Sequence, residues 1–239
     1  MIFHRYMHQD DILAQNKMVY NAISEQFAQT RKFLWDMLKP LGKYIQDGDV
    51  ILDLGCGTGR LYQLFQNFQG EVGVFYTGVD VSEGQIAVAK KQFSGAHFVV
   101  GDMLSIPSEN HVFDTIYCIA VFHHLPDRET RLKSLQEMRR VLKPGGRVIM
   151  TNWNLSGAWG REKVATGAYE PIGEGDFFVP WKDTDGNVLG KRWYHSFDLD
   201  ELIDLFGTVG AVVEEQYYTN GKEKSNQHEG KNIVSIVRF

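Results

Sequence analysis

Five short apolar segments, separated by stretches of helical character, constrain the fold of this chain more than any other feature. They lie between residues 49 and 153 and read DVILDLG, FYTGVDV, AHFVVGD, FDTIYCIAV and GRVIMTNW. Several are apolar almost throughout, which is typical of strands that are buried on both faces of a sheet. Strands that alternate with helices at this spacing form a parallel sheet. The chain therefore predicts an α/β fold built on a doubly wound, mostly parallel sheet.

Three further segments surround this core, which we place at residues 49–153. Residues 1–46 carry apolar residues at helical spacing and predict two helices that form an N-terminal lid. Residues 154–195 are rich in glycine and aromatic residues without a clean period, so we expect a substrate-recognition insertion. Residues 196–239 predict a helix and two strands, which bring the sheet to seven strands. We treat residues 1–239 as a single domain.

The composition excludes several classes of protein. The chain has 25 Lys and Arg residues against 30 Asp and Glu residues, and this net charge of −5 does not indicate a basic nucleic-acid-binding surface. Its two cysteines, Cys56 and Cys118, cannot form a disulfide framework or a four-ligand zinc site alone. There is no apolar run of about 18 residues and no signal-peptide core at the N-terminus. We expect a soluble cytoplasmic protein with no membrane partner.

A glycine-rich loop directly follows the first predicted strand and precedes a predicted helix. It reads Asp53-Leu54-Gly55-Cys56-Gly57-Thr58-Gly59. Glycines let the backbone pass close to a ligand, and the start of a helix presents free N–H groups there. A dinucleotide-binding fingerprint requires a third glycine at the position of Arg60, which disfavours a nicotinamide-dependent dehydrogenase. The observed spacing resembles motif I of the class I S-adenosylmethionine (SAM)-dependent methyltransferases, which have a Rossmann-like fold.

This resemblance implies SAM as cofactor and S-adenosylhomocysteine as product, and two later carboxylates support it. Asp80 ends the second predicted strand, where a carboxylate accepts both hydroxyls of a ribose. Asp102 follows the third strand, where it accepts from an adenine amino group while Met103 packs on the ring. A single acid would indicate a loop cap, but acids at successive strand ends indicate a ligand. The expected cofactor contacts are Tyr20, Arg31, Asp53, Gly55, Gly57, Asp80, Val81, Asp102, Met103 and Ile119.

The segment after the fourth predicted strand reads VFHHLP and begins at Val121. In many methyltransferases of this class the equivalent segment lines the space between the sulfonium methyl and the substrate. His123 is therefore a candidate for orienting a substrate, and a hydrogen-bonded structural histidine is an almost equally good interpretation. No carboxylate or cysteine stands at ligand spacing around these histidines, so we assign no metal.

Three stretches outside the core resemble a narrower family. Residues 20–35 read YNAISEQFAQTRKFLW, residues 176–181 read DFFVPW, and residues 192–197 read RWYHSF. They are similar to segments of the tRNA wobble-uridine methyltransferases, which esterify 5-carboxymethyluridine; these segments follow the patterns Y-x-x-I-A-x-x-F-x-x-T-R-x-x-x-W, D-x-x-V-P-W and R-Y-Y-H-x-F. The resemblance covers roughly residues 19–239. It implies tRNA as the substrate and a small zinc-binding activator protein as a partner.

The same resemblance implies which residues face the methyl acceptor. A carboxylate is already ionised at pH 7, so direct in-line methyl transfer to it needs no general base. Trp181 and the group Trp193, Tyr194 and His195 are expected to face the transferred methyl, and Trp181, His195 and His123 are expected to orient the acceptor. Arg31 is expected on one helical face with Phe27, close to the transferred methyl, where its guanidinium holds either the methionine carboxylate of SAM or the acceptor.

The residues alone allow two alternative functions to be weighed. The aromatic insertion would cap a small apolar pocket as readily as it would stack a nucleobase, so a methyltransferase for a small carboxylic acid, phenol or amine is the main alternative. A binding protein that retains the fold without activity is disfavoured by the intact Asp53, Gly55, Gly57 and Asp80. The chain also departs from the tRNA-modifying pattern, because the stretch after Arg31 lacks the usual proline and the acidic net charge is unusual for phosphate binding.

Overall fold

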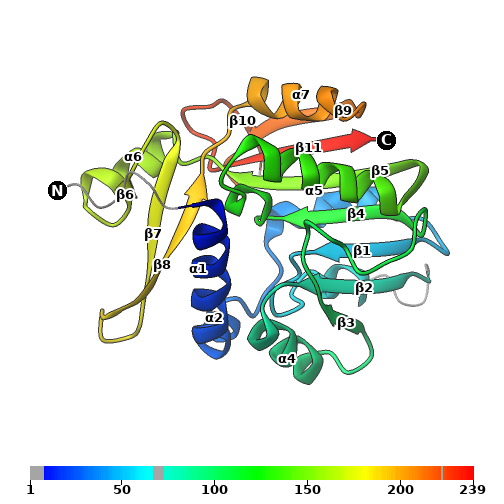
Figure 1. Ribbon diagram of the computed structural model, residues 1–239, viewed down its shortest axis with the longest axis horizontal. Coiled ribbons are helices and arrows are strands. Elements are labelled where there is room, and N and C mark those ends of the chain that lie inside the picture. The colour runs from blue at the N-terminus through cyan, green and yellow to red at the C-terminus, as the bar shows by residue number, and fades with distance from the viewer. Residues whose placement is uncertain (1–7, 67–72, 222) are drawn as a thin grey trace.

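An eight-stranded sheet lies at the centre of the fold in the computed structural model, which describes residues 8–66, 73–221 and 223–239 (Figure 1). In spatial order its strands are β10 (Lys224–Ser225), β9 (Val212–Thr219), β11 (Asn232–Arg238), β5 (Leu142–Trp153), β4 (Phe113–Ile119), β1 (Val50–Leu54), β2 (Phe75–Asp80) and β3 (His97–Val100). The strands β1 to β5 pair in parallel, while β11, β9 and β10 are antiparallel to their neighbours. The expected α/β fold is confirmed, and the two-residue edge strand β10 accounts for the eighth strand.

Helices cover both faces of this sheet. One face carries η1 (Asp36–Tyr44), α3 (Tyr62–Gln66) and α4 (Glu83–Gln92), and the other carries α5 (Arg128–Val141) and α7 (Leu199–Thr208). Alternate residues of β4 divide between the two apolar clusters: Ile116 and Cys118 pack toward α5 and α7, and Tyr117 packs toward η1 and α3. This two-sided burial explains why the strand reads as a continuous apolar run.

Local sequence signals set several helix ends. Asp127 precedes α5 as expected, and its carboxylate accepts a hydrogen bond from the backbone N–H of Thr130 at 2.9 Å. Such a cap satisfies one of the free N–H groups in the first turn. Ser82 and Asp198 cap α4 and α7 in the same way.

The N-terminal segment differs from the expected pair of α-helices. It folds as α1 (Gln9–Ala22), the short α2 (Ser24–Thr30) and the 3₁₀-helix η1, while residues 1–7 of the expected lid lie outside the described residues. Pro40 stands inside η1, and a proline there removes a backbone donor and obstructs a regular α-helix. Leu38 and Leu41 of η1 are nonetheless buried, so the apolar spacing identified the contact face correctly.

The insertion also has more regular structure than its sequence indicates. It contains α6 (Ala158–Ala165) and a small antiparallel sheet of β6 (Glu170–Pro171), β7 (Asp176–Lys182) and β8 (Val188–His195). Both faces of this sheet are buried, because Phe177 and Val179 pack with Leu155 while Phe178 and Trp193 pack with Ile12 of α1. Burial on both faces removes the alternation of polar and apolar residues that would have indicated the strands.

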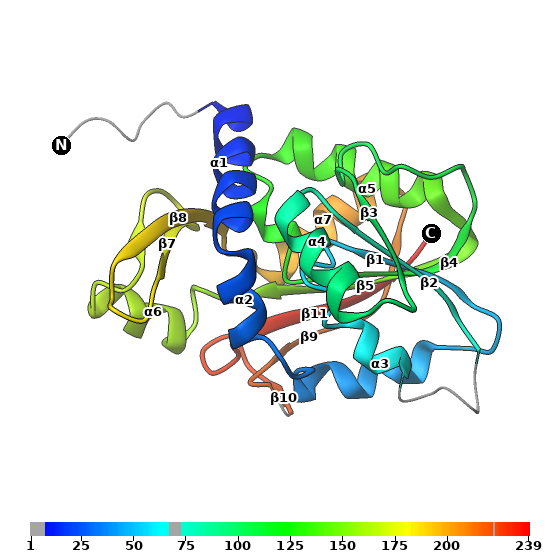
Figure 2. The same cartoon turned by 90° about the horizontal axis from the view of Figure 1, so that it is seen from below.

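The small sheet stands beside the main sheet, with α1 between them (Figures 1 and 2). Its two connections to the main fold lie next to each other, since the backbone N–H groups of Leu155 and Ser156 both donate to the Ser196 hydroxyl, at 2.9 and 3.1 Å. Within the described ranges, no helix is long and apolar enough to cross a membrane.

Substitution of Gly59 tests how tightly the glycine loop packs against the core. Its φ is +79°, and an added Cβ would lie 2.7 Å from Cζ of the buried Phe98. Gly145 is a matched control, because its φ is +80° but no atom lies within 4 Å of an added Cβ. We expect Gly59→Ala to lower the free energy of unfolding by about 3 kcal/mol and Gly145→Ala by about 1 kcal/mol in denaturant titrations. Equal losses in the two variants would contradict the packing argument.

Candidate active site

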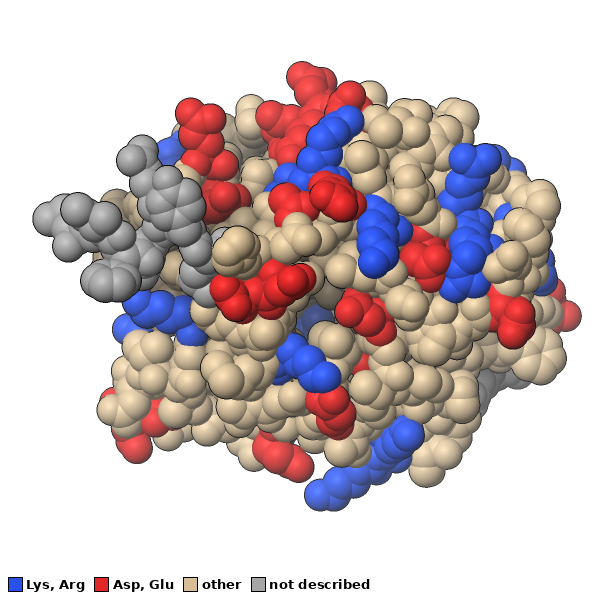
Figure 3. Space-filling model, in the orientation of Figure 1, with Lys and Arg blue, Asp and Glu red and all other residues tan. Residues whose placement is uncertain are grey.

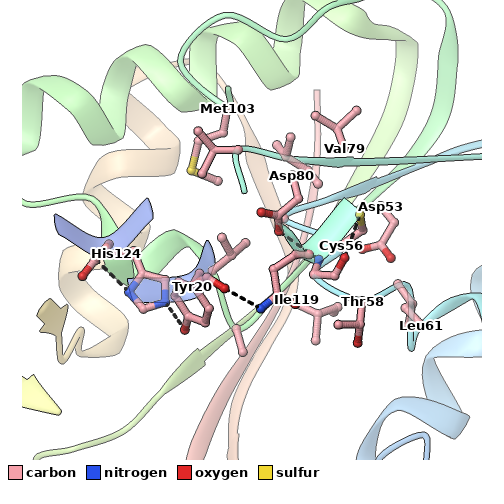
Figure 4. Close-up of a pocket in the computed structure, with 18 of the residues that line it drawn as sticks. Tyr20, Asp53, Cys56, Thr58, Leu61, Val79, Asp80, Met103, Ile119 and His124 are labelled. Atoms are coloured by element: carbon pink, nitrogen blue, oxygen red, sulfur yellow. Dashed lines mark hydrogen bonds between the residues drawn. The ribbon is translucent and has the colours of Figure 1, made fainter. Parts of the chain in front are cut away.

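A single pocket spans the carboxyl ends of β1, β2 and β4 and is bordered on its far side by α1, η1 and β8 (Figure 4). All the expected cofactor contacts line it, from Tyr20 and Arg31 through the glycine loop to Asp80, Val81, Asp102, Met103 and Ile119. The strand topology brings them together, because parallel strands deliver their following loops to one edge of the sheet. Within the residues that the structure describes, no group of three His, Cys, Asp or Glu side chains is arranged to hold a metal ion.

The glycine loop is tightly packed at Gly55 but leaves room beside the backbone at Gly57. Gly55 has φ +75°, and a Cβ there would lie 2.5 Å from the Val121 side chain. Gly57 has φ +55°, and the atom nearest to an added Cβ there would be Gln85 Oε1, at 3.8 Å. This buried oxygen lacks a hydrogen-bond partner. The space beside Gly57 and this unpartnered oxygen fit a polar ligand at the loop. The helix that follows, α3, begins at Tyr62, three residues after the last glycine of the loop, and its described part runs to Gln66.

Two carboxylates stand at the loop, the buried Asp53 and the partly buried Asp80. Asp80 accepts the backbone N–H of Gly57 at 2.8 Å through Oδ2 and that of Ser82 at 2.9 Å through Oδ1. Asp53 accepts the Tyr76 hydroxyl at 2.7 Å. Burial raises the pKa of both acids, that of Asp53 to about 7, where the Tyr76 hydrogen bond opposes the increase and the Asp80 charge adds to it. Asp80 therefore fixes the loop while its remaining lone pairs face the pocket.

The other contacts on the cofactor side are less enclosed. Asp102 is exposed and accepts the backbone N–H of Leu104 at 2.8 Å, so it caps its own turn while it lines the pocket. Val81 is 38% exposed, an unusual position for an aliphatic side chain, and it lies with Met103 at the rim. Apolar groups at a pocket rim suit the flat face of an aromatic ring.

On the opposite side of the pocket lies His124, a residue of η2 (Phe122–His124). A chain of hydrogen bonds determines which of its ring nitrogens carries the proton (Figure 4). Its Nδ1 lies 2.9 Å from the carbonyl oxygen of Trp193, so this nitrogen carries the proton and donates it. Nε2 then accepts from the Tyr20 hydroxyl at 3.0 Å. The Tyr194 hydroxyl lies 3.2 Å from the Tyr20 oxygen and donates to it. Burial lowers the pKa of His124 to about 3, so the ring is neutral at pH 7.

Asn16 ties this chain to the hairpin of β7 and β8. Its side-chain Oδ1 accepts the backbone N–H of Trp193 at 2.7 Å, and its Nδ2 donates to the carbonyl oxygen of the same residue at 3.1 Å. The buried amide thus pairs with β8 as an adjacent strand would. As a result α1, β8 and η2 are held in one arrangement on this side of the pocket.

The structure corrects the position expected for His123, because this side chain does not line the pocket. It is fully buried, its ring stacks on Tyr194 at 4.8 Å between centroids, and its Nδ1 accepts the backbone N–H of Trp153 at 3.2 Å. Burial lowers the pKa of His123 well below its usual value. The alternative interpretation, a structural histidine, therefore fits, and its neighbour His124 lines the pocket instead.

Trp181 and His195 also lie away from the pocket lining that we expected for them. Trp181 packs against Val19 of α1 and against Ile23, which connects α1 to α2, and it donates from Nε1 to Gln26 at 3.2 Å. His195 points to the other side of β8, toward acidic residues of β7 and α7. His195 supports the hairpin from the face that points away from the pocket, whereas Trp181 lies on the same face as Arg192, whose guanidinium is 5.2 Å from its ring.

Arg31 does line the pocket, but not as part of a helical face. The helix α2 ends at Thr30, and Arg31 follows it with φ −124° and ψ 36°. Its guanidinium lies 5.5 Å from the centre of the Phe27 ring and 5.9 Å from that of Trp181. The expected proximity to Phe27 therefore arises from a turn rather than from helical periodicity.

Sequence reasoning expected Tyr194 on the acceptor side as part of the Trp193-Tyr194-His195 group, but it did not single out Arg192, the other residue of β8 that lines the pocket. Side chains two apart on a strand lie on the same face, so Arg192 and Tyr194 face the pocket together and the intervening Trp193 and the following His195 face away. That alternation was the available signal, and it required knowing that this stretch is a strand.

Comparison with known proteins agrees with this site. Residues 52–150 match the model of the methyltransferase domain family. A protein of Encephalitozoon cuniculi named as a methyltransferase is 31% identical over 197 residues, which cover 81% of this chain and 85% of the relative. A solved complex of a Haloferax volcanii methyltransferase with the Trm112 methyltransferase activator contains a similar chain, with a TM-score of 0.63 and 17% identity over 93% of this chain and 96% of that one.

The chain belongs to the class I SAM-dependent methyltransferases, and SAM is its cofactor. Within that class it resembles the tRNA (carboxymethyluridine(34)-5-O)-methyltransferases. The Schizosaccharomyces pombe enzyme of that name is 28% identical over 218 residues, which cover 84% of this chain and 90% of the relative.

The hydrogen bonds of His195 lead us to expect that the free energy of unfolding depends on pH. Its Nδ1 lies 2.6 Å from Asp176 and its Nε2 lies 3.0 Å from Glu201, an arrangement that requires a proton on both nitrogens. Burial disfavours the charged ring, but these two hydrogen bonds outweigh it and raise the pKa above 6.5. Because the folded-state pKa is raised, the stabilisation is complete below about pH 6.5 and is lost as the pH rises through the folded-state value.

We therefore expect His195→Gln to lower the free energy of unfolding by about 2 kcal/mol at pH 6, and by less at pH 8.5. Denaturant titrations of both proteins across this pH range measure the difference directly. A difference that stays constant with pH would show that the ring is not charged in the folded protein.

Proposed function

We propose that this methyltransferase esterifies the carboxylate of 5-carboxymethyluridine at the wobble position of tRNA by direct in-line transfer. The observation that carries the proposal is the lack of an available general base beside the acceptor among the described residues. A phenol or an ammonium group must lose a proton before it attacks a methyl group, whereas a carboxylate is already ionised at pH 7.

Among the described residues, the groups near the acceptor side that could accept a proton are already engaged. The Nε2 lone pair of His124 accepts the Tyr20 hydroxyl, and the pKa of about 3 leaves this imidazole a very weak base. Lys17 is paired with Glu83 at 2.6 Å. Asp53 has a suitable pKa of about 7, but it is held by Tyr76 across the pocket from His124 (Figure 4). These contacts favour an acceptor that needs no deprotonation.

When bound, SAM supplies a methyl group on a positively charged sulfur; the carboxylate oxygen forms the new bond to carbon as the carbon–sulfur bond breaks, and S-adenosylhomocysteine leaves. In this proposal Asp80 accepts the ribose hydroxyls, Asp102 and Met103 contact the adenine, and Gly57 lets the backbone approach the ligand. Arg31, on the border of the pocket near Phe27, holds the methionine carboxylate. The protein then contributes mainly orientation and the exclusion of water.

The tRNA substrate is supported by the relatives and by the stretches that resemble them. The S. pombe relative is named for methylating carboxymethyluridine at position 34 of tRNA, and the resemblance extends through the hairpin that borders the acceptor side. On the face shown in Figure 3, Lys and Arg are interspersed with Asp and Glu, so no broad basic surface is visible there. We propose that an activator of the Trm112 type, as in the H. volcanii complex, binds this chain and supplies part of the tRNA-binding surface.

The ribose role of Asp80 is testable by binding. We expect Asp80→Asn to weaken binding of S-adenosylhomocysteine by about tenfold or more in calorimetry, because the amide replaces an anionic acceptor of charge-assisted hydrogen bonds. Asp47→Asn is a matched control, since Asp47 accepts a backbone N–H of Gly73 at 2.7 Å but does not line the pocket. Unchanged affinity in Asp80→Asn would remove Asp80 from this role.

The decisive experiment uses labelled SAM, the protein with and without a Trm112-type activator, and tRNA that carries 5-carboxymethyluridine. We expect an alkali-labile methyl ester on the wobble nucleotide, and label in a small-metabolite pool instead would contradict the proposal. The variant His124→Gln tests the chemistry in the same assay. Loss of a general base lowers turnover about 10²–10⁴-fold, whereas we expect a loss within tenfold, because glutamine can still accept the Tyr20 hydroxyl.

A further inference from the structure

Arg192 is a buried cation without a counter-ion. Its residue is 4% exposed, and within the described part of the chain no carboxylate forms an ion pair with it. Its Nη1 lies 3.4 Å from the Tyr20 hydroxyl, a long hydrogen bond, and its buried Nε has no partner. A guanidinium has five N–H donors, so most of its hydrogen-bonding capacity is unused here.

Aromatic rings hold this guanidinium in place. Its central carbon lies 5.6 Å from the centre of the Tyr20 ring, 5.2 Å from that of Trp181 and 5.4 Å from that of Tyr194. Ring faces stabilise a cation but do not use its N–H donors. The side chain is therefore positioned before any ligand arrives, and its donors stay available.

Arg131, a second buried arginine near the hairpin, has its partners within the protein. Arg131 is 6% exposed, and it donates to Glu201 at 2.8 Å and to the carbonyl oxygens of Leu125 and Pro126. A buried charge without such partners is strongly unfavourable. The difference between the two arginines indicates that the partner of Arg192 is a ligand that arrives in the pocket, which Arg192 lines.

Another arginine of the pocket lies at the glycine loop. Arg60 directly follows the glycine loop, its guanidinium stacks on Trp35 at 3.9 Å, and its buried Nη1 lacks a partner. Arg192 instead shares its side of the pocket with Tyr20 and His124, across from Asp53 and Cys56 (Figure 4). Arg60 and Arg31 would be available to hold the methionine carboxylate of bound SAM, which leaves Arg192 for a second anion.

We propose that Arg192 binds the carboxylate of the methyl acceptor and determines specificity for a carboxylate over its neutral amide. The inference rests on the proposed function in one respect, namely that the acceptor is a carboxylate. Binding through the planar, bidentate fork leaves one carboxylate lone pair free to attack the methyl carbon. The proposal explains both the missing counter-ion of Arg192 and the absence of a base beside it.

The test uses protein loaded with S-adenosylhomocysteine and two nucleosides, 5-carboxymethyluridine and its neutral counterpart 5-carbamoylmethyluridine. Binding is followed by calorimetry for the wild type, Arg192→Lys and Arg192→Met. We expect the wild type to bind the carboxylate at least tenfold more tightly than the amide, Arg192→Lys to retain part of this preference, and Arg192→Met to lose it. Affinity for S-adenosylhomocysteine should stay within twofold in all three proteins.

Arg161→Met is the matched control, because Arg161 belongs to the same insertion but is exposed and does not line the pocket. Thermal melting separates a binding role from a structural one. Removal of an uncompensated buried charge should raise the melting temperature of ligand-free Arg192→Met by about 2 °C or more, whereas loss of a structural arginine would lower it. A lower melting temperature, an unchanged carboxylate preference in Arg192→Met, or no carboxylate binding by the wild type would each overturn the inference.

The two proposals fail separately. A wild-type protein that binds the carboxylate nucleoside through Arg192 but leaves tRNA unmethylated, with activator present, would contradict the proposed function and support the inference. Methylation of the tRNA carboxylate with full activity in Arg192→Lys and Arg192→Met would support the proposed function and overturn the inference.

Discussion

The pairing of the Asn16 side chain with the backbone of Trp193 is the interaction on which the acceptor side of the pocket depends. A helix and a strand have no regular way to share backbone hydrogen bonds, and here a buried amide supplies the missing edge of β8. Through it, α1 places Tyr20 against His124 and Arg192. An amide suits this task because it carries one donor and one acceptor in the spacing of a peptide group.

The two sides of the pocket are therefore built by different means. The cofactor side follows from local order, since each loop begins where a parallel strand ends and Asp80 needs only neighbouring N–H groups to hold the glycine loop. The acceptor side is assembled from residues far apart in the chain, since Tyr20 is 104 positions from His124 and 174 positions from Tyr194. Its electrostatics are also unusual, because a neutral imidazole and a buried, unpaired guanidinium stand side by side.

This contrast explains how much could be predicted from the sequence. The glycine spacing and the acids at strand ends predicted the fold class and the lining of the cofactor side, because strand, loop and ligand contact are adjacent in the chain. The acceptor side was predicted by segment but only partly by residue. The hairpin lies there and Tyr194 lines the pocket as expected, but Arg192 was not singled out, and Trp181 and His195 are not part of the lining. Burial on both faces of β7 and β8 hid the alternation that decides which side chains point inward.

The hydroxyl of Ser196 joins the two connections of the insertion, so a segment of about forty residues is attached to the parallel sheet at one place. A segment attached in this way can diverge or be exchanged during evolution without disturbing the hydrogen bonding between β1, β2, β4 and β5. The glycine loop and its carboxylates would stay unchanged while the acceptor side acquired new side chains. If the proposed function holds, choice of the methyl acceptor would depend on this attached hairpin together with α1 and η2, while the use of SAM would depend on the sheet.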